Sequence, residues 1–258
     1  MKLVTWNVNG IRAREAQLRE LVEREHPDVV CLQEIKATPT QVPALLFDPG
    51  GYWAYWHGAS AYSGVALHVR RTLAPERPAF AHPSFDHECR IVTAELGPLT
   101  VASAYVPNGG KDFAAKMRFL EALDAWVAER HGQGRQLVLC GDLNVARADV
   151  DVHPKERKPG AIGQRPEERE LFARLLGRGL VDLGRALHPS DDALFTWWAP
   201  WRNLRQRNIG WRIDYVLASE LLAARATRCD SLREFGTSDH GPIVVELSDT
   251  TAAPFRSP

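Results

Sequence analysis

The amino-acid sequence predicts an α/β fold, and three observations carry this prediction. The chain has 258 residues, 45% of them hydrophobic and 25% charged, which is typical of a globular protein with a substantial core. Residues 137–140 form an apolar run without a polar break, typical of a strand buried on both faces. Residues 2–33 alternate as strand, helix and strand, the order found in α/β sheets. Length alone leaves one large domain and two small ones open.

Charge and cysteine usage narrow the class of protein. The formal net charge is zero, so a nucleic-acid enzyme would need local basic patches. The four cysteines are scattered and form no C-x-x-C, which disfavours a zinc site and favours a reduced, cytoplasmic protein. No stretch approaches transmembrane length, and the N-terminus lacks a signal-peptide pattern, so we expect no membrane association.

Apolar runs bounded by Gly, Pro and Asn predict six strands in the first half of the chain. These strands span residues 2–8, 28–33, 52–57, 64–70, 88–96 and 99–106. Residues 12–24 place charges opposite an apolar stripe that includes Leu18 and Leu21, which predicts a helix. The turn at residues 58–63 and the Gly97-Pro98 pair predict two hairpins.

The second half predicts two further helices and three strands. Helical spacing of apolar residues covers residues 112–131, and Pro166 begins a helix that Gly177 ends. The strands lie within residues 136–145, 213–219 and 243–247. Residues 146–165 lack periodicity and are locally basic, which fits either a solvated loop or a loop that contacts a nucleic-acid backbone.

Aromatic and arginine side chains alternate after residue 195. Trp197, Trp198 and Trp201 lie close to Arg202, Arg205, Arg207 and Arg212. This mixture suits nucleic-acid contact, because rings pack on sugars or bases while Arg pairs with phosphate. The alternative is that the tryptophans are core residues and the arginines lie along them.

Eight polar residues lie at or beside the ends of predicted strands. They are Asn7, Glu34, Tyr105, Asp142, Asn144, Asp214, Asp239 and His240. Each alone fits a turn or a solvent-facing position, but strand ends on one edge of a sandwich would bring them into one pocket. Such a set, without a thiolate and with a single His, suits a hard cation such as Mg²⁺ and phosphoryl chemistry.

These residues belong to motifs that resemble the exonuclease III / apurinic-apyrimidinic (AP) endonuclease family of the endonuclease–exonuclease–phosphatase superfamily. The motifs are WNVNG at residues 6–10, LQEIK at 32–36, YVPNGG at 105–110, GDLNVA at 141–146, GWRIDYVLAS at 210–219 and SDHGP at 238–242. They occur in the family order over nearly the whole chain. The resemblance implies a four-layer α/β sandwich of two mixed sheets flanked by helices, forming one catalytic domain over residues 1–248 with a flexible tail at 249–258.

The same resemblance implies an activity and its partners. It implies a Mg²⁺-dependent DNA-repair phosphodiesterase, with Mn²⁺ able to replace Mg²⁺, that hydrolyses the backbone 5′ to abasic sites. Cleavage of 3′ ends, by exonuclease or phosphodiesterase activity, is a further expectation. We expect a monomer that acts in the cytoplasm, with the nucleoid, on double-stranded DNA containing abasic sites.

Site roles also follow from the resemblance, residue by residue. Glu34, with Asn7 and Asp239, matches the metal ligands. Asp142 matches the group that orients or deprotonates the attacking water, with Asn144 beside it. His240 matches the imidazole at the scissile phosphate and Asp214 its carboxylate partner, and Tyr105 matches an active-site contact. The expected DNA and substrate contacts are Asn108, Lys111, Trp197, Trp211, Arg212 and Ile213, of which Trp197, Trp211 and Ile213 form the wall of an abasic-sugar pocket.

Departures from the family and two alternative functions accompany this assignment. Asn9 and Lys111 stand where some relatives carry Asp and Arg, and residues 158–165 differ from the relatives. One alternative is a phosphodiesterase or phosphatase of another superfamily branch that acts on inositol phosphates or sphingolipids. The other is a nucleic-acid-binding module without catalysis. The intact set of acids with His240 argues against the second, and the Trp/Arg segment argues against the first.

Overall fold

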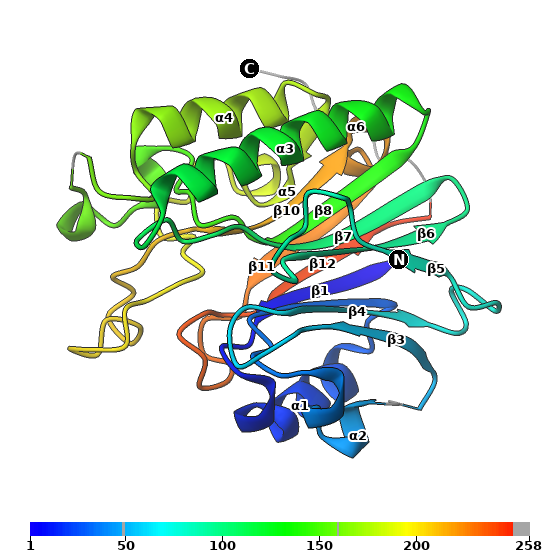
Figure 1. Cartoon of the computed structure of the whole chain (residues 1–258). Coiled ribbons are helices and arrows are strands. Elements are labelled where there is room, and N and C mark those ends of the chain that lie inside the picture. The colour runs from blue at the N-terminus through cyan, green and yellow to red at the C-terminus, as the bar shows by residue number, and fades with distance from the viewer. Residues whose placement is uncertain (48–49, 159, 250–258) are drawn as a thin grey trace.

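Two six-stranded sheets packed face to face, with helices on their outer sides, form the protein (Figure 1). The computed structural model describes residues 1–47, 50–158 and 160–249. This architecture confirms the four-layer α/β sandwich. Of the predicted tail at 249–258, all but Asp249 lies outside the described residues.

The sheets have equal strand numbers and mixed strand directions. The first has the order β11-β12-β1-β2-β4-β3, with strands Ala226–Ser231, Ile243–Leu247, Lys2–Asn7, Val29–Gln33, Val65–Arg70 and Tyr52–His57. The second has the order β5-β6-β7-β8-β10-β9, with strands Ala79–Ala81, Ile91–Leu96, Leu99–Tyr105, Gln136–Asp142, Asp214–Ser219 and Leu180–Asp182. Each sheet has one parallel pair, β1 with β2 and β7 with β8, and its other described pairs are antiparallel.

Helices cover the outer faces of both sheets. Helices α1 (Glu15–Glu25) and α2 (Ala44–Phe47) lie outside the first sheet, and α3 (Phe113–Gly132) and α4 (Pro166–Leu176) outside the second (Figure 1). Two shorter helices, α5 (Leu183–Leu187) and α6 (Glu220–Ala223), follow β9 and β10. Short 3₁₀ turns occupy Ile11–Ala13, Pro39–Gln41, Asp149–Asp151 and Pro154–Glu156.

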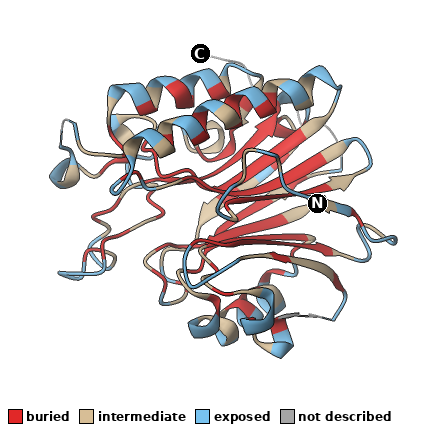
Figure 2. Ribbon diagram, in the orientation of Figure 1, coloured by how far each residue is buried: buried red, intermediate tan, exposed pale blue. Residues whose placement is uncertain are grey.

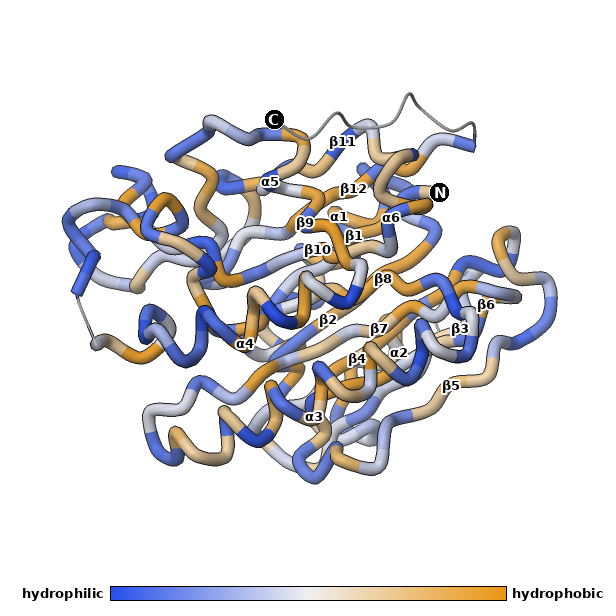
Figure 3. The backbone as a smooth tube through the Cα atoms, turned by 90° about the horizontal axis from the view of Figure 1, so that it is seen from above, coloured by the Kyte–Doolittle hydropathy of each residue, from blue (hydrophilic) through white to orange (hydrophobic). Residues whose placement is uncertain are grey.

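Burial on both faces explains why the central strands are continuously apolar. One core cluster lies between the sheets and contains Cys31 of β2 and Cys140 of β8, and two others pack the helices on the outer faces. The central strands are buried along most of their length (Figure 2), and Figure 3 shows hydrophobic residues concentrated in strands such as β8, with hydrophilic loops around the periphery. Both cysteines are small core residues with free thiols.

The predicted elements differ from the structure mainly at helix starts and short edge strands. The helix predicted at 12–24 begins only at Glu15, because Arg14 has a non-helical backbone that separates it from a 3₁₀ turn. The sequence did not predict β5, β9 or β11, which are short or polar and depend on a neighbouring strand. In the part of the chain described here, no helix has the length and apolar character needed to cross a membrane.

Candidate active site

Strands of both sheets end at the candidate active site. In the second sheet, Tyr105, Asp142 and Asp214 are direct neighbours across β7, β8 and β10. In the first sheet, Asn7 ends β1 and Glu34 follows β2. Because β10 runs antiparallel to β8, its first residue reaches the edge at which β8 ends. Side chains that are far apart in the sequence therefore meet at one point.

The buried Asn7 side chain joins the two sheets at this point. Its Nδ2 donates hydrogen bonds of 2.9 Å to Glu34 Oε1 and to Asp142 Oδ2, while its Oδ1 accepts one of 3.0 Å from the backbone N of Asn9. An amide carries no formal charge. Asn7 therefore holds the two carboxylates close together without neutralising either one.

Asp142 and Asn144 lie side by side, but a turn brings them together. The backbone N of Asn144 donates to Asp142 Oδ1 over 2.9 Å, and its Nδ2 lies 3.2 Å from Asp142 Oδ2. Strand β8 ends at Asp142, and Asn144 has a left-handed φ of 53°, which Asn adopts more readily than most residues. Their proximity therefore comes from this turn and not from the alternation of side chains along a strand.

Two further groups hold Asn144 in place. Asn108 Nδ2 donates to Asn144 Oδ1 over 3.3 Å, and Lys116 Nζ donates to the Asn144 carbonyl over 2.6 Å. Asn108 is exposed at the rim, whereas Lys116 is fully buried below.

His240 is held by Asp214 on the side away from Asp142. Its Nδ1 lies 2.9 Å from Asp214 Oδ2, which also accepts a hydrogen bond of 2.7 Å from Thr196 Oγ1, and its Nε2 lies 3.9 Å from Asp142 Oδ2. Burial by itself would lower the pKa of His240, but the carboxylates of Asp214, Asp142 and Asp239 outweigh it and raise the pKa to about 10. The imidazole is therefore a cation at neutral pH.

The carboxylates of the site outnumber the cationic groups that face them. Burial raises the pKa of Asp142, and the charges of Asp214 and Glu34 raise it further, to about 8 against the opposing charge of His240. One carboxylate oxygen of Glu34, one of Asp142 and one ring nitrogen of His240 lie within 4.8 Å of one another. Lys36 Nζ lies 2.8 Å from Glu34 Oε2 and acts as its counter-ion. Closely packed oxygen donors with excess negative charge suit a hard divalent cation.

Asp239 connects the carboxylate cluster to an aromatic wall. Its Oδ1 accepts a hydrogen bond of 2.8 Å from Asn9 Nδ2, and its Oδ2 accepts one of 3.0 Å from Trp197 Nε1. The indole of Trp197 meets that of Trp211 edge to face, with ring centroids 5.8 Å apart.

A cavity of about 320 Å³ brings the polar cluster and this wall together. Its lining consists of Glu34, Tyr105, Asn108, Asp142, Asn144, Ile162, Gly163, Trp197, Trp211, Ile213, Asp239 and His240. Burial, with the charges of Glu34 and Asp142, raises the pKa of Tyr105, so its phenol stays protonated and can donate a hydrogen bond.

Comparison with known proteins accounts for this arrangement. The Endonuclease/Exonuclease/phosphatase family matches residues 4–240. The chain belongs to this family. It is 35% identical to an exodeoxyribonuclease of Bacillus subtilis (strain 168), covering 96% of this chain and 100% of that protein, and 37% identical to the DNA repair nuclease APEX1 of Danio rerio, covering 96% and 82%.

Solved structures of family members agree with the sequence relatives. A 3′ phosphatase from Neisseria bound to product DNA hairpin superposes with a TM-score of 0.88 at 32% identity, covering 96% of this chain and 99% of that one. An AP endonuclease from Archaeoglobus fulgidus gives 0.87 at 28%, covering 97% and 100%. The predicted assignment to the exonuclease III / AP endonuclease branch, and with it the enzyme class of hydrolytic nuclease, is confirmed.

Two side chains predicted to contact DNA do not line the cavity, and for Lys111 the contact stays a prediction. Arg212 is 2% exposed, and its guanidinium pairs with Asp151 and Asp182 at 2.7 and 2.8 Å. The expectation that Arg212 contacts DNA is therefore wrong, because the side chain is buried and forms ion pairs with Asp151 and Asp182. Lys111 is exposed outside the cavity, with its Nζ 5.8 Å from the centroid of the Tyr62 ring.

Sequence reasoning missed a buried ion pair that supports the site. Lys116 of α3 and Glu168 of α4 are both fully buried and pair with each other. Glu168 also accepts hydrogen bonds from the backbone N of Gly163 and of Arg165. The sequence held a signal, because Lys116 lies one turn from Phe113 and Leu120 on the apolar side of α3.

Gly163, on the loop that this ion pair supports, also escaped prediction. Its φ is +87°, and a Cβ there would lie 3.0 Å from the Trp211 ring. Glycine therefore allows the loop to pass directly against the aromatic wall.

The buried pair yields a stability prediction. Lys116→Met leaves the Glu168 carboxylate buried without its cation, so we expect the free energy of unfolding in urea to fall by about 3–5 kcal/mol. The double variant Lys116→Met with Glu168→Gln should recover part of this loss. The control variant Lys155→Met, at an exposed lysine, should change the free energy of unfolding little. Wild-type stability of Lys116→Met would contradict the structural role.

Proposed function

We propose that the chain is a Mg²⁺-dependent DNA-repair phosphodiesterase that hydrolyses the DNA backbone 5′ to abasic sites, acting as a monomer on double-stranded DNA. The observation that carries the proposal is one cavity in which Asp142 and His240 face the wall of Trp197, Trp211 and Ile213. Groups suited to hydrolysing a phosphodiester and groups suited to holding an apolar sugar thus share one space.

The side chains divide the work of phosphodiester hydrolysis. Asp142, whose pKa is raised to about 8 and so lies close to neutral pH, orients and deprotonates the attacking water. Protonated His240, fixed by Asp214, donates to a phosphate oxygen and stabilises the charge that develops there. Tyr105 and Asn144 position the phosphate, and Asn108 extends this contact to the rim.

The donor set fits a divalent cation. Glu34 and Asp239, which line the same cavity, would hold Mg²⁺ through their carboxylate oxygens, and Mn²⁺ has the same preference for oxygen donors. Asn7, predicted as a third ligand, instead orients Glu34 through its Nδ2, because its amide oxygen accepts a hydrogen bond from the backbone N of Asn9. Bound there, the ion would polarise a phosphate oxygen and favour the ionised form of the neighbouring carboxylates.

The aromatic wall favours an abasic sugar over a full nucleotide. A sugar that has lost its base is compact, has apolar faces and rotates out of the duplex at lower cost than a paired nucleotide. Trp197 and Trp211 close one side of the cavity at right angles to each other, which limits its width. The same cavity suits 3′-terminal cleavage less well, so we expect 3′-exonuclease and 3′-phosphodiesterase activities to be secondary.

Relatives support DNA as the substrate class. One is named a DNA repair nuclease, and one solved structure is described as bound to a product DNA hairpin. An inositol-phosphate or sphingolipid phosphodiesterase would use a similar carboxylate cluster without needing paired tryptophans beside it. A non-catalytic binding module would gain nothing from buried carboxylates facing phosphate.

Metal removal tests the hydrolytic part of the proposal. With a duplex containing one abasic site, we expect EDTA to abolish nicking and Mg²⁺ or Mn²⁺ to restore it. Glu34→Gln should raise the Mg²⁺ concentration for half-maximal nicking by about tenfold or more. Glu23→Gln, at an exposed glutamate of α1, should not change it. Full activity in EDTA would refute the requirement for a cation.

Selectivity for the abasic sugar is tested at Trp211. Trp211→Ala should reduce incision at an abasic site by about tenfold or more relative to removal of intact 3′ nucleotides, because the cavity loses one wall. Trp201→Ala is the matched control, since Trp201 is 60% exposed and does not line the cavity. A ratio of the two activities that stays constant in a Trp211→Ala protein of normal melting temperature would exclude Trp211 from substrate selection.

A further inference from the structure

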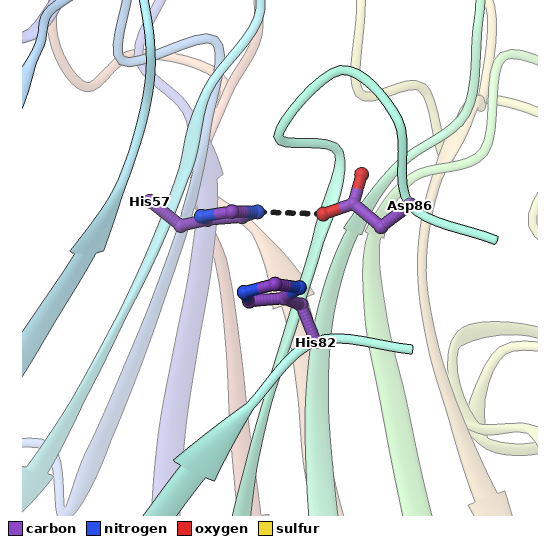
Figure 4. Close-up of side chains that lie close together, drawn as sticks. All are labelled: His57, His82 and Asp86. Atoms are coloured by element: carbon purple, nitrogen blue, oxygen red, sulfur yellow. Dashed lines mark hydrogen bonds and ion pairs between the residues drawn. The ribbon is translucent and has the colours of Figure 1, made fainter. Parts of the chain in front are cut away.

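A second cluster of metal-ligating side chains lies where the edge strand of one sheet meets the edge strand of the other. His57 is the last residue of β3, the edge strand of the first sheet, and His82 directly follows β5, the edge strand of the second. Asp86 lies in the loop between β5 and β6 (Figure 4). None of these residues lines the cavity described above.

The three side chains are close enough to share one ion. His57 Nε2 lies 2.6 Å from Asp86 Oδ2, and one ligand atom from each residue lies within 4.8 Å of the other two. The two imidazoles stack, with ring centroids 4.4 Å apart and planes inclined by 10° (Figure 4). Two imidazoles and one carboxylate form a donor set that prefers Zn²⁺ and similar transition metals over Mg²⁺.

Two of the ligands are already oriented. The Asp86 side chain is fully buried, and its second oxygen, Oδ1, accepts a hydrogen bond of 2.8 Å from the backbone N of Arg90. A hydrogen bond that fixes a ligating carboxylate is a common feature of protein metal sites.

His82 supplies the adjustable ligand. It is exposed, and it makes no hydrogen bond to any residue within 1–47, 50–158 or 160–249. Imidazole lone pairs lie in the ring plane, so stacked rings do not aim at a common point. The exposed ring of His82 can turn its edge towards Asp86 and His57 without disturbing the core.

We propose that His57, His82 and Asp86 bind one transition-metal ion of the Zn²⁺ class, which ties the edge strands of the two sheets together. The aromatic stack of Tyr55 on Phe80, at 5.4 Å, shows that β3 and β5 already meet here. The loop that carries Asp86 leads to Arg90, whose guanidinium lies 4.9 Å from the Tyr105 ring. The ion therefore stabilises the fold and the loop behind Tyr105, independently of the proposed catalytic cation.

The substitution His82→Phe separates a ligand role from a packing role, because Phe keeps a ring on His57 but offers no nitrogen. We expect Zn²⁺, added with Mg²⁺ in excess, to raise the melting temperature of the wild type by at least about 3 °C. Equilibrium dialysis should find one more equivalent of Zn²⁺ on the wild type than on His82→Phe. The variant should keep its metal-free melting temperature and lose the rise.

His188→Ala is the matched control. His188 also faces an aspartate, with its Nε2 3.5 Å from Asp230 Oδ1, but no second histidine accompanies it in the clusters found among the described residues. This variant should bind Zn²⁺ as the wild type does. Asp86→Asn supplies a second test, because it should weaken Zn²⁺ binding at least about tenfold. Equal stoichiometry and equal thermal response in the wild type and His82→Phe would overturn the proposal.

Discussion

The contact between Asn7 and Asp142 is the constraint on which the rest of the site depends. It joins β1 of one sheet to β8 of the other, and the same Asn7 nitrogen also binds Glu34. The contact exists only because the two sheets pack with these strand ends in register, and the apolar cluster between them sets that packing. The packing of the core between the sheets therefore sets the geometry of the active site. Any shift of one sheet against the other would separate the carboxylates.

Keeping carboxylates together in a buried site has an electrostatic cost, and the structure offsets it in two ways. Neutral amides of Asn7, Asn9 and Asn144 donate hydrogen bonds without cancelling charge. Cationic groups stand at the margins, with His240 on one side and Lys36 on another. The balance leaves negative charge in excess, which suits a bound cation and explains why the pKa of His240 rises despite burial.

Sequence patterns predicted the elements that carry the site better than the way in which they meet. Apolar runs placed β1, β2, β7, β8 and β10 within a few residues, because strands buried on both faces have an unmistakable composition. Trp211 and Ile213 line one cavity, as the family resemblance implies, although both precede the strand, which begins only at Asp214. Arg212 could not be assigned correctly, since nothing local indicates that Asp151 and Asp182 converge on it. The Lys116–Glu168 pair likewise depends on two helices meeting.

The proposed hydrolysis depends most on Asp142, and separate measurements of binding and turnover test the role of this residue most directly. Asp142→Asn keeps the shape of the side chain but removes its ability to accept a proton. We expect kcat for incision of an abasic duplex to fall at least about 100-fold, equivalent to about 2.7 kcal/mol, while Kd for that duplex stays constant or decreases, because a negative charge beside phosphate is lost. A folded variant that binds abasic duplex much more weakly, or that turns over within about twofold of the wild type, would contradict the account.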